Sequence, residues 1–134
     1  MTKLDKWNEV KKNTESKKFF LTTKPREIYW VKIGQNIGSE EFGKSEIFSR
    51  PVIVIRRLTS DLFVGIPTTS SIKDNDYFLP FEYKTKNKIV QSSAMLLQIR
   101  TFSIKRITDK IGKMNIDDFK VLEERLVRML FPPK

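Results

Sequence analysis

The stretch SRPVIVIRRLTSDLFVGIPTTSS, residues 49–71, decides the fold expected for this chain. It holds two short runs of β-branched and aromatic residues, VIVI at 52–55 and LFV at 62–64, separated by the turn-forming segment LTSD at 58–61. This pattern predicts an antiparallel β-hairpin. A turn centred between Thr59 and Ser60 pairs residues whose numbers sum to about 119, which brings Arg50 across from Thr69.

The juxtaposition of Arg50 and Thr69 has two interpretations. Both residues stand just outside the apolar runs, where side chains can face a ligand instead of the core, so a cation and a hydroxyl form a candidate site at one end of the sheet. In the other interpretation, Arg50 forms a surface ion pair with Glu46 or Glu82, and Thr69 caps a turn.

The composition narrows the chemistry that is open to such a site. The chain has 134 residues, with 26 Lys and Arg against 16 Asp and Glu, which gives a formal charge of +10. That excess favours a polyanion or an acidic partner. The sequence contains neither Cys nor His, which excludes thiol nucleophiles, Cys-ligated metals and imidazole acid–base chemistry. Catalysis would have to use carboxylates, Arg, Lys, Tyr or hydroxyl groups.

Residues 1–25 form a basic extension ahead of the main domain. Leu4, Trp7 and Val10 share one edge of a helix expected over residues 3–12. Its polar face is either a solvated surface, with Trp7 packed on the main domain, or a surface that binds RNA or a partner. We find no signal peptide and no apolar run of membrane-spanning length, and the lack of Cys fits a reducing compartment, so we expect a cytoplasmic protein.

The remaining chain predicts further short strands and one helix. Residues 27–33 alternate as a strand, with Ile28, Trp30 and Lys32 on one face, and a long loop over 34–48 follows. Strand patterns recur at 77–83, where Pro80 indicates an edge strand, and at 94–99 and 102–104, followed by a short link at 110–114. Asn115 is a good N-cap for an amphipathic helix that ends before two prolines. Five strands between two helices predict a small curled sheet or barrel with a C-terminal helix.

Asp74, Asn75 and Asp76 are a fragment of a metal-binding loop without its remaining oxygen ligands, so we interpret them as a turn. The sequence contains no phosphate-binding P-loop and no dinucleotide fingerprint.

Six motifs then follow one another in a recognisable order: EIYWV at 27–31, GSE at 38–40, RPVIVI at 50–55, PTTS at 67–70, QIRT at 98–101 and KIG at 110–112. Together they resemble the MazF/PemK family of toxins from bacterial toxin–antitoxin pairs, over roughly residues 26–130. The resemblance implies a mainly β (α+β) fold, an SH3-like small barrel of antiparallel strands (CcdB/MazF-like) with a C-terminal helix, in a toxin domain over 26–134. It also implies a homodimer and a cognate antitoxin with an acidic segment.

The activity implied by the resemblance is cleavage of single-stranded RNA at specific sequences, without a metal or other cofactor. Carried over by motif, the catalytic residues are Arg50, Thr69 and Glu40. The RNA-binding candidates are Ser39, Lys44, Ser70, Lys73 and Gln98. The chain departs from the family at Leu97, where many members carry an Asp, and in a longer interval between the GSE and RPVIVI motifs, for which Glu41 or Glu46 are substitute bases.

Two alternatives stay open at this stage. One is a relative with weakened catalysis, because Leu97 cannot transfer a proton, that still binds RNA or an antitoxin. The other is a non-enzymatic inhibitor on the same fold, of the kind that poisons DNA gyrase through its C-terminal residues. The ending MLFPPK at 129–134 gives no support to the second.

Overall fold

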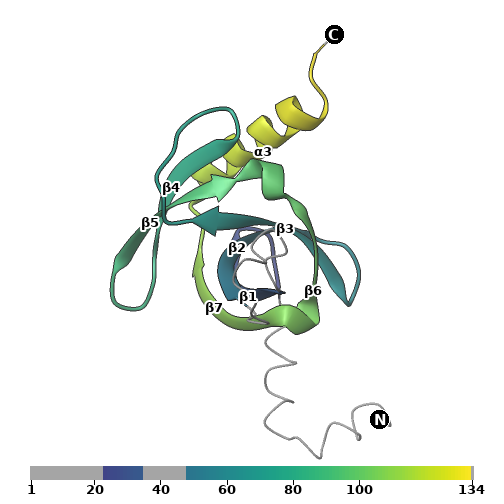
Figure 1. Ribbon diagram of the computed structural model, residues 1–134, viewed down its shortest axis with the longest axis vertical. Coiled ribbons are helices and arrows are strands. Elements are labelled where there is room, and N and C mark those ends of the chain that lie inside the picture. The colour runs from purple at the N-terminus through teal and green to yellow at the C-terminus, as the bar shows by residue number, and fades with distance from the viewer. Residues whose placement is uncertain (1–22, 35–47, 134) are drawn as a thin grey trace, which may run out of the picture.

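The computed structural model describes residues 23–34 and 48–133, which form a strongly curved antiparallel sheet with a helix against one side (Figure 1). The strands are β1 (Glu27–Gly34), β2 (Phe48–Arg57), β3 (Leu62–Thr69), β4 (Phe78–Lys84), β5 (Ile89–Met95), β6 (Arg100–Ser103) and β7 (Ile107–Lys113). Two 3₁₀ turns, η2 (Leu96–Gln98) and η3 (Ile104–Arg106), flank β6, and the helix is α3 (Ile116–Leu130). The helix predicted over 3–12 and the interior of the loop predicted over 34–48 lie outside the described residues.

The strand order is β4-β5-β3-β2-β1-β7, with β6 paired to β3. This confirms the predicted antiparallel barrel with a C-terminal helix, but the predicted number of five strands is wrong. The sequence from Ile107 to Lys113 was expected to be partly a link, whereas it forms β7, most of whose residues are exposed or half-buried. An edge strand of that kind has little apolar alternation to reveal it.

The predicted register of the central hairpin is confirmed over its middle. Val52 pairs with Pro67, Ile53 with Ile66 and Val54 with Gly65. The ladder between β2 and β3 ends at Pro67, and β3 then pairs with β5 through Thr68 and Thr69. We call this place between Pro67 and Thr68, where the ladder with β2 ends and the ladder with β5 begins, the seam.

Both faces of the central strands are buried. Ile28, Ile53 and Ile66 belong to a core shared with β4, β5 and α3, whereas the neighbouring residues Tyr29 and Val52 belong to a second core shared with β6, η3 and β7. Because side chains alternate along a strand, a slip of one residue would exchange the two cores. The register that brings Arg50 to the seam is therefore fixed from both sides.

The predicted helix is confirmed at its start. The Asn115 side-chain oxygen accepts hydrogen bonds from the N–H groups of Asp117 and Asp118, at 2.7 and 3.3 Å. Phe119, Leu122 and Leu126 are buried on the side that faces the sheet. Among the residues that the structure describes, no helix is both long and apolar enough to cross a membrane.

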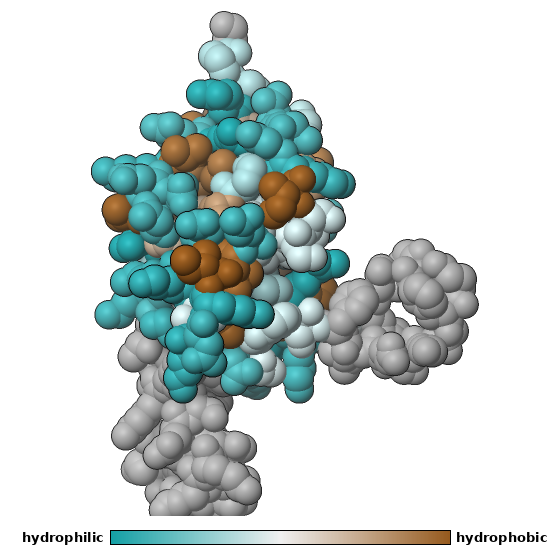
Figure 2. Space-filling model, turned by 90° about the vertical axis from the view of Figure 1, so that its left-hand side faces the viewer, coloured by the Kyte–Doolittle hydropathy of each residue, from teal (hydrophilic) through white to brown (hydrophobic). Residues whose placement is uncertain are grey.

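The two outer strands of the sheet meet, which closes the barrel. A Cβ atom built on Gly112 of β7 would lie 2.7 Å from Tyr83 Cδ2 and 3.0 Å from the Lys84 carbonyl oxygen of β4. Pro80 lies within β4, which stands at one end of the strand order, and this confirms the prediction that Pro80 marks an edge strand. Figure 2 shows the side with the β4–β5 hairpin, where hydrophilic surface surrounds separate hydrophobic patches.

A buried carboxylate ties β1 to β7. Glu27, whose side chain is 7% exposed, accepts hydrogen bonds from Lys110 Nζ at 2.8 Å, Tyr29 Oη at 2.7 Å and the Lys24 N–H at 2.8 Å. Burial alone would raise the pKa of Glu27, but these hydrogen bonds and the charge of Lys110 lower it overall. Burial and the same carboxylate raise the pKa of Tyr29, so its hydroxyl stays a donor.

A carboxyl group whose pKa is lowered by folding stabilises the folded state above its ordinary pKa of 4.5, and this contribution is lost as the pH falls through the lowered value. We expect Glu27→Gln to lower the free energy of unfolding by about 1 to 3 kcal/mol at neutral pH, less than for a fully buried pair because the Lys110 side chain is 38% exposed. Urea unfolding at about pH 7 and about pH 3.5 should show the difference from wild type shrinking in acid. An equal difference at both pH values would contradict this account of Glu27.

Candidate functional site

A cavity of about 540 Å³ opens at the seam, where the ladder between β2 and β3 ends. Its walls come from six strands, β1 to β5 and β7, and include Arg50 and Pro51 of β2, Thr68 of β3 and Ser92 of β5. A cavity forms here because the strands diverge beyond Val52 and Pro67 and no ladder fills the space between them.

Arg50 is the only charged residue of β2 that lines this cavity, and it is held without being neutralised. Its Nη1 donates to the Thr68 carbonyl oxygen at 3.2 Å, and Thr68 Oγ1 donates to the Pro51 carbonyl oxygen at 3.2 Å. The ion pairs found in the described part of the chain involve Lys110 and Arg125 and leave Arg50 without a carboxylate. A half-buried guanidinium in this state can bind an anion through its remaining N–H groups.

Thr69 is the last residue of β3, and Ser70 is the next residue in the chain. Thr69 is half-buried, and its hydroxyl oxygen accepts a hydrogen bond from the Ser71 N–H at 3.2 Å, which is the turn-capping role of the second interpretation. A hydroxyl that accepts one bond can still donate its own hydrogen. Ser70 is exposed and lines the cavity together with Arg50. The alternative pairing of Arg50 with Glu82 is wrong, and Glu46 lies outside the described residues.

The other predicted site residues divide into two groups. Ser39, Glu40 and Lys44 lie outside the described residues. Lys73 and Gln98 are exposed but do not line the cavity; the Lys73 Nζ lies 4.9 Å from the centroid of the Phe78 ring, and Gln98 ends η2.

Sequence reasoning missed several lining residues, among them Trp30, Tyr83 and Lys88. The alternation along 27–33 places Trp30 on the face opposite Tyr29 and Val31, as the structure confirms, but it does not reveal that Trp30 shares a cavity with Tyr83 and Lys88. Burial raises the pKa of the Tyr83 hydroxyl, so it stays protonated near neutral pH and can donate a hydrogen bond.

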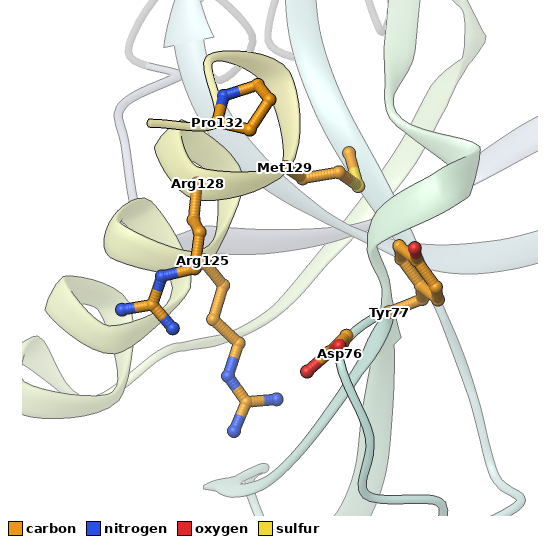
Figure 3. A pocket seen from close by; sticks show the side chains of 6 residues that line it. All are labelled: Asp76, Tyr77, Arg125, Arg128, Met129 and Pro132. Atoms are coloured by element: carbon orange, nitrogen blue, oxygen red, sulfur yellow. The ribbon is translucent and has the colours of Figure 1, made fainter. Parts of the chain in front are cut away.

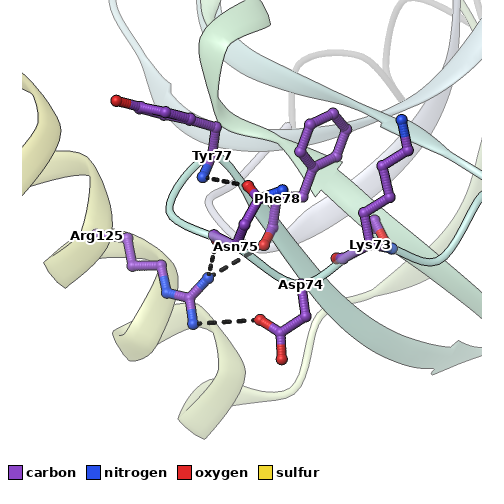
Figure 4. Close-up of polar contacts among 7 residues, drawn as sticks. Lys73, Asp74, Asn75, Tyr77, Phe78 and Arg125 are labelled. Atoms are coloured by element: carbon purple, nitrogen blue, oxygen red, sulfur yellow. Dashed lines mark hydrogen bonds and ion pairs between the residues drawn. The ribbon is translucent and has the colours of Figure 1, made fainter.

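A second cavity, of about 390 Å³, lies between α3 and the β3–β4 loop (Figure 3). It is also lined by arginine, but the Arg125 guanidinium binds other residues of the protein. Arg125 Nη1 donates to the carbonyl oxygens of Asn75 and Phe78 at 2.9 and 3.1 Å, and Nη2 lies 3.7 Å from Asp74 Oδ1 (Figure 4). Asn75 Oδ1 accepts from the Tyr77 N–H at 2.8 Å, which confirms the predicted turn. The seam cavity is therefore the better candidate site.

Comparison with known proteins agrees with this fold. Residues 24–130 match the family model described as PemK-like, MazF-like toxin of type II toxin–antitoxin system. A mycobacterial endoribonuclease in complex with its cognate antitoxin is similar in structure, with a TM-score of 0.62 and 13% identity over 84% of this chain and 99% of that one. MazF from Deinococcus radiodurans has a TM-score of 0.59 and 16% identity over 81% and 96%. No curated protein sequence matches. At these identities the structures establish likeness of fold.

The contrast between two arginines of α3 tests the structural role of Arg125. We expect Arg125→Met to lower the free energy of unfolding by about 1 to 3 kcal/mol, because two carbonyl groups lose a charged donor. Arg128→Met is the matched control on the exposed side of the same cavity, and we expect a change within about 0.5 kcal/mol. Urea denaturation of the three proteins makes the comparison, and equal losses in both variants would contradict the role given to Arg125.

Proposed function

Because the chain belongs to the family of PemK-like and MazF-like toxins of type II toxin–antitoxin systems, we propose that it is a metal-independent endoribonuclease that cuts single-stranded RNA at specific sequences. The observation that carries the proposal is the state of Arg50. The guanidinium is half-buried at a cavity, fixed by the Thr68 carbonyl, and paired with no carboxylate among the residues described.

Arg50 supplies the electrostatic part of the proposed reaction. The 2′-OH of the ribose attacks the adjoining phosphorus, the bond to the 5′-oxygen breaks, and the products are a 2′,3′-cyclic phosphate and a 5′-OH end. The phosphorane carries an extra negative charge on its nonbridging oxygens, and a cation already in place stabilises that charge. Thr69 donates its hydroxyl hydrogen to one of these oxygens, since its oxygen already accepts from the Ser71 N–H.

Proton transfer is assigned to the β1–β2 loop. Glu40 is the proposed base that takes the proton of the 2′-OH, with Glu41 or Glu46 as substitutes in this longer loop. Balance requires that a proton reach the leaving 5′-oxygen, from the protonated base or from water. Leu97 cannot take part, and its side chain is 61% exposed at the position where a carboxylate is common in the family.

The remaining proposed contacts follow the charge of the chain. The RNA backbone and bases are held by Ser39, Lys44, Ser70, Lys73 and Gln98. A protein with a net charge of +10 should bind RNA with an affinity that falls steeply with salt. The same charge suits an antitoxin with an acidic segment, and we propose that the chain acts in the cytoplasm as a homodimer that such an antitoxin blocks.

A relative with weakened catalysis is the second candidate, and the exposed Leu97 is the observation that favours it. It would bind RNA or the antitoxin at the same cavity without efficient proton transfer. The C-terminal residues give no support to a gyrase-type inhibitor.

The decisive experiment incubates the purified protein with a long mixed-sequence RNA in EDTA. We expect wild type to cut at a limited set of sites and leave 5′-OH ends. Arg50→Ala should lose about 3 kcal/mol of transition-state stabilisation, a rate loss on the order of a hundredfold or more. Thr69→Ala should lose less, because one neutral donor is removed.

Arg128→Ala is the control, since this arginine lies on α3 away from the seam. If folded wild-type protein leaves the RNA intact, the endoribonuclease is rejected in favour of the relative that binds RNA or the antitoxin without efficient catalysis. Equal cutting by wild type, Arg50→Ala and Thr69→Ala would reject the seam as the catalytic centre.

A further inference from the structure

The seam cavity continues past β1 into a neighbouring cavity of about 600 Å³, which is separate from the one beside α3. The two share Trp30, Thr85, Lys88 and Ile111, so they form one groove from Arg50 to the turn between β4 and β5. This turn projects from the barrel on the left of Figure 1, and the same side faces the viewer in Figure 2.

Trp30 lies where the two cavities join. It is 36% exposed, between the fully buried Tyr29 and Val31, and it pairs across the sheet with Pro51 on one side and Asp109 on the other. A partly exposed indole in a hydrophilic groove offers a flat apolar surface on which an unstacked base can lie.

Two lysines border the groove beside Trp30. The Thr85 N–H and Oγ1 both donate to the Lys88 carbonyl oxygen, at 2.8 and 3.1 Å, which fixes the turn that carries Lys86 and Lys88. Both lysines are exposed, and neither forms an ion pair within the described ranges. Lys110 also lines this part of the groove, but it is paired with Glu27.

Asp109 is an acid in this otherwise basic groove. It is exposed, it is the cross-strand partner of Trp30, and no ion pair engages it in the described part of the chain. A carboxylate repels phosphate, so it weakens backbone binding. It can instead accept hydrogen bonds from the N–H groups on the edge of a base.

We propose that Trp30, Asp109, Lys86 and Lys88 form a nucleotide-binding subsite that holds one base of a single-stranded RNA beside the Arg50 cavity. The base stacks on Trp30, its N–H groups donate to Asp109, and the adjoining phosphates lie at the two lysines. The inference rests on the proposed function, since the same strand continues to Arg50. It adds a residue that reads base identity, Asp109, which none of the six motifs includes.

Fluorescence tests the stacking contact directly. The chain has two tryptophans, so Trp7→Phe leaves Trp30 as the only one. Titration with a randomised 2′-O-methyl RNA of about 14 nucleotides, which cannot be cut because it lacks free 2′-OH groups, should quench the emission to saturation. Because Trp30→Ala and Trp30→Phe remove this fluorophore, their affinities are measured by the anisotropy of the same oligomer carrying a fluorescent dye. Trp30→Ala should weaken binding about tenfold and Trp30→Phe much less, with circular dichroism to confirm that both are folded.

Substitutions of the charged residues test two different properties, the salt dependence of RNA binding for the lysines and the base preference for Asp109. Lys86→Ala with Lys88→Ala should reduce the slope of log affinity against log salt by about 1.4, whereas Lys105→Ala with Lys120→Ala, outside the groove, should leave it unchanged. Asp109→Asn should alter the ratio of affinities for 2′-O-methyl oligomers of A, C and U, and the lysine variant should weaken all three alike.

The outcomes separate the two proposals. If wild type cuts RNA but the Trp30 emission and the affinity ratios are unaffected, the subsite is wrong and the endoribonuclease stands. If the emission is quenched and the ratios respond to Asp109→Asn while no RNA is cut, the subsite stands and the endoribonuclease is wrong. Absence of RNA binding overturns both.

Discussion

The site depends on one constraint, which is that the pairing partners of β3 change along its length. Its first part pairs with β2 up to Pro67 and with β6 up to Gly65, and its last two residues pair with β5. The first part is anchored on both faces, because Ile53 and Ile66 are buried in one core and Val52 and Phe63 in the other. The strands therefore separate at a fixed place, and the cavity with Arg50 in its wall is the result.

Electrostatics distinguish this place from the rest of a basic surface. Arg125 also lies in a cavity, but its guanidinium is used to hold the β3–β4 loop against α3. Lys110 likewise forms an ion pair with the buried Glu27. Among the described residues, Arg50 is held by one neutral carbonyl and pairs with no carboxylate, so its guanidinium is oriented without its charge being cancelled. That combination of fixed position and free charge is what a phosphoryl reaction requires of a cation.

Local patterns in the sequence predicted much of the local structure, although the strand expected at 94–99 is wrong, because β5 ends at Met95 and the 3₁₀ turn η2 follows. The hairpin register, the Asn115 cap and the edge position of Pro80 all depend on near neighbours, and all are confirmed. The missed features are those set by distant contacts. The seam depends on β5, which begins in the polar segment after Lys88, and β7 is recognised through its pairing with β1 more than through its own pattern. Arg50 was predicted from sequence, whereas its partner, the Thr68 carbonyl, belongs to the backbone and leaves no signal in residue types.

The most direct test of the account is a structure of this protein bound to a 2′-O-methyl RNA that it cannot cut. The account predicts a phosphate group within about 3 Å of the Arg50 guanidinium, in the cavity where β3 leaves β2. RNA bound against Arg125 and Arg128 on α3, with no phosphate at Arg50, would contradict it.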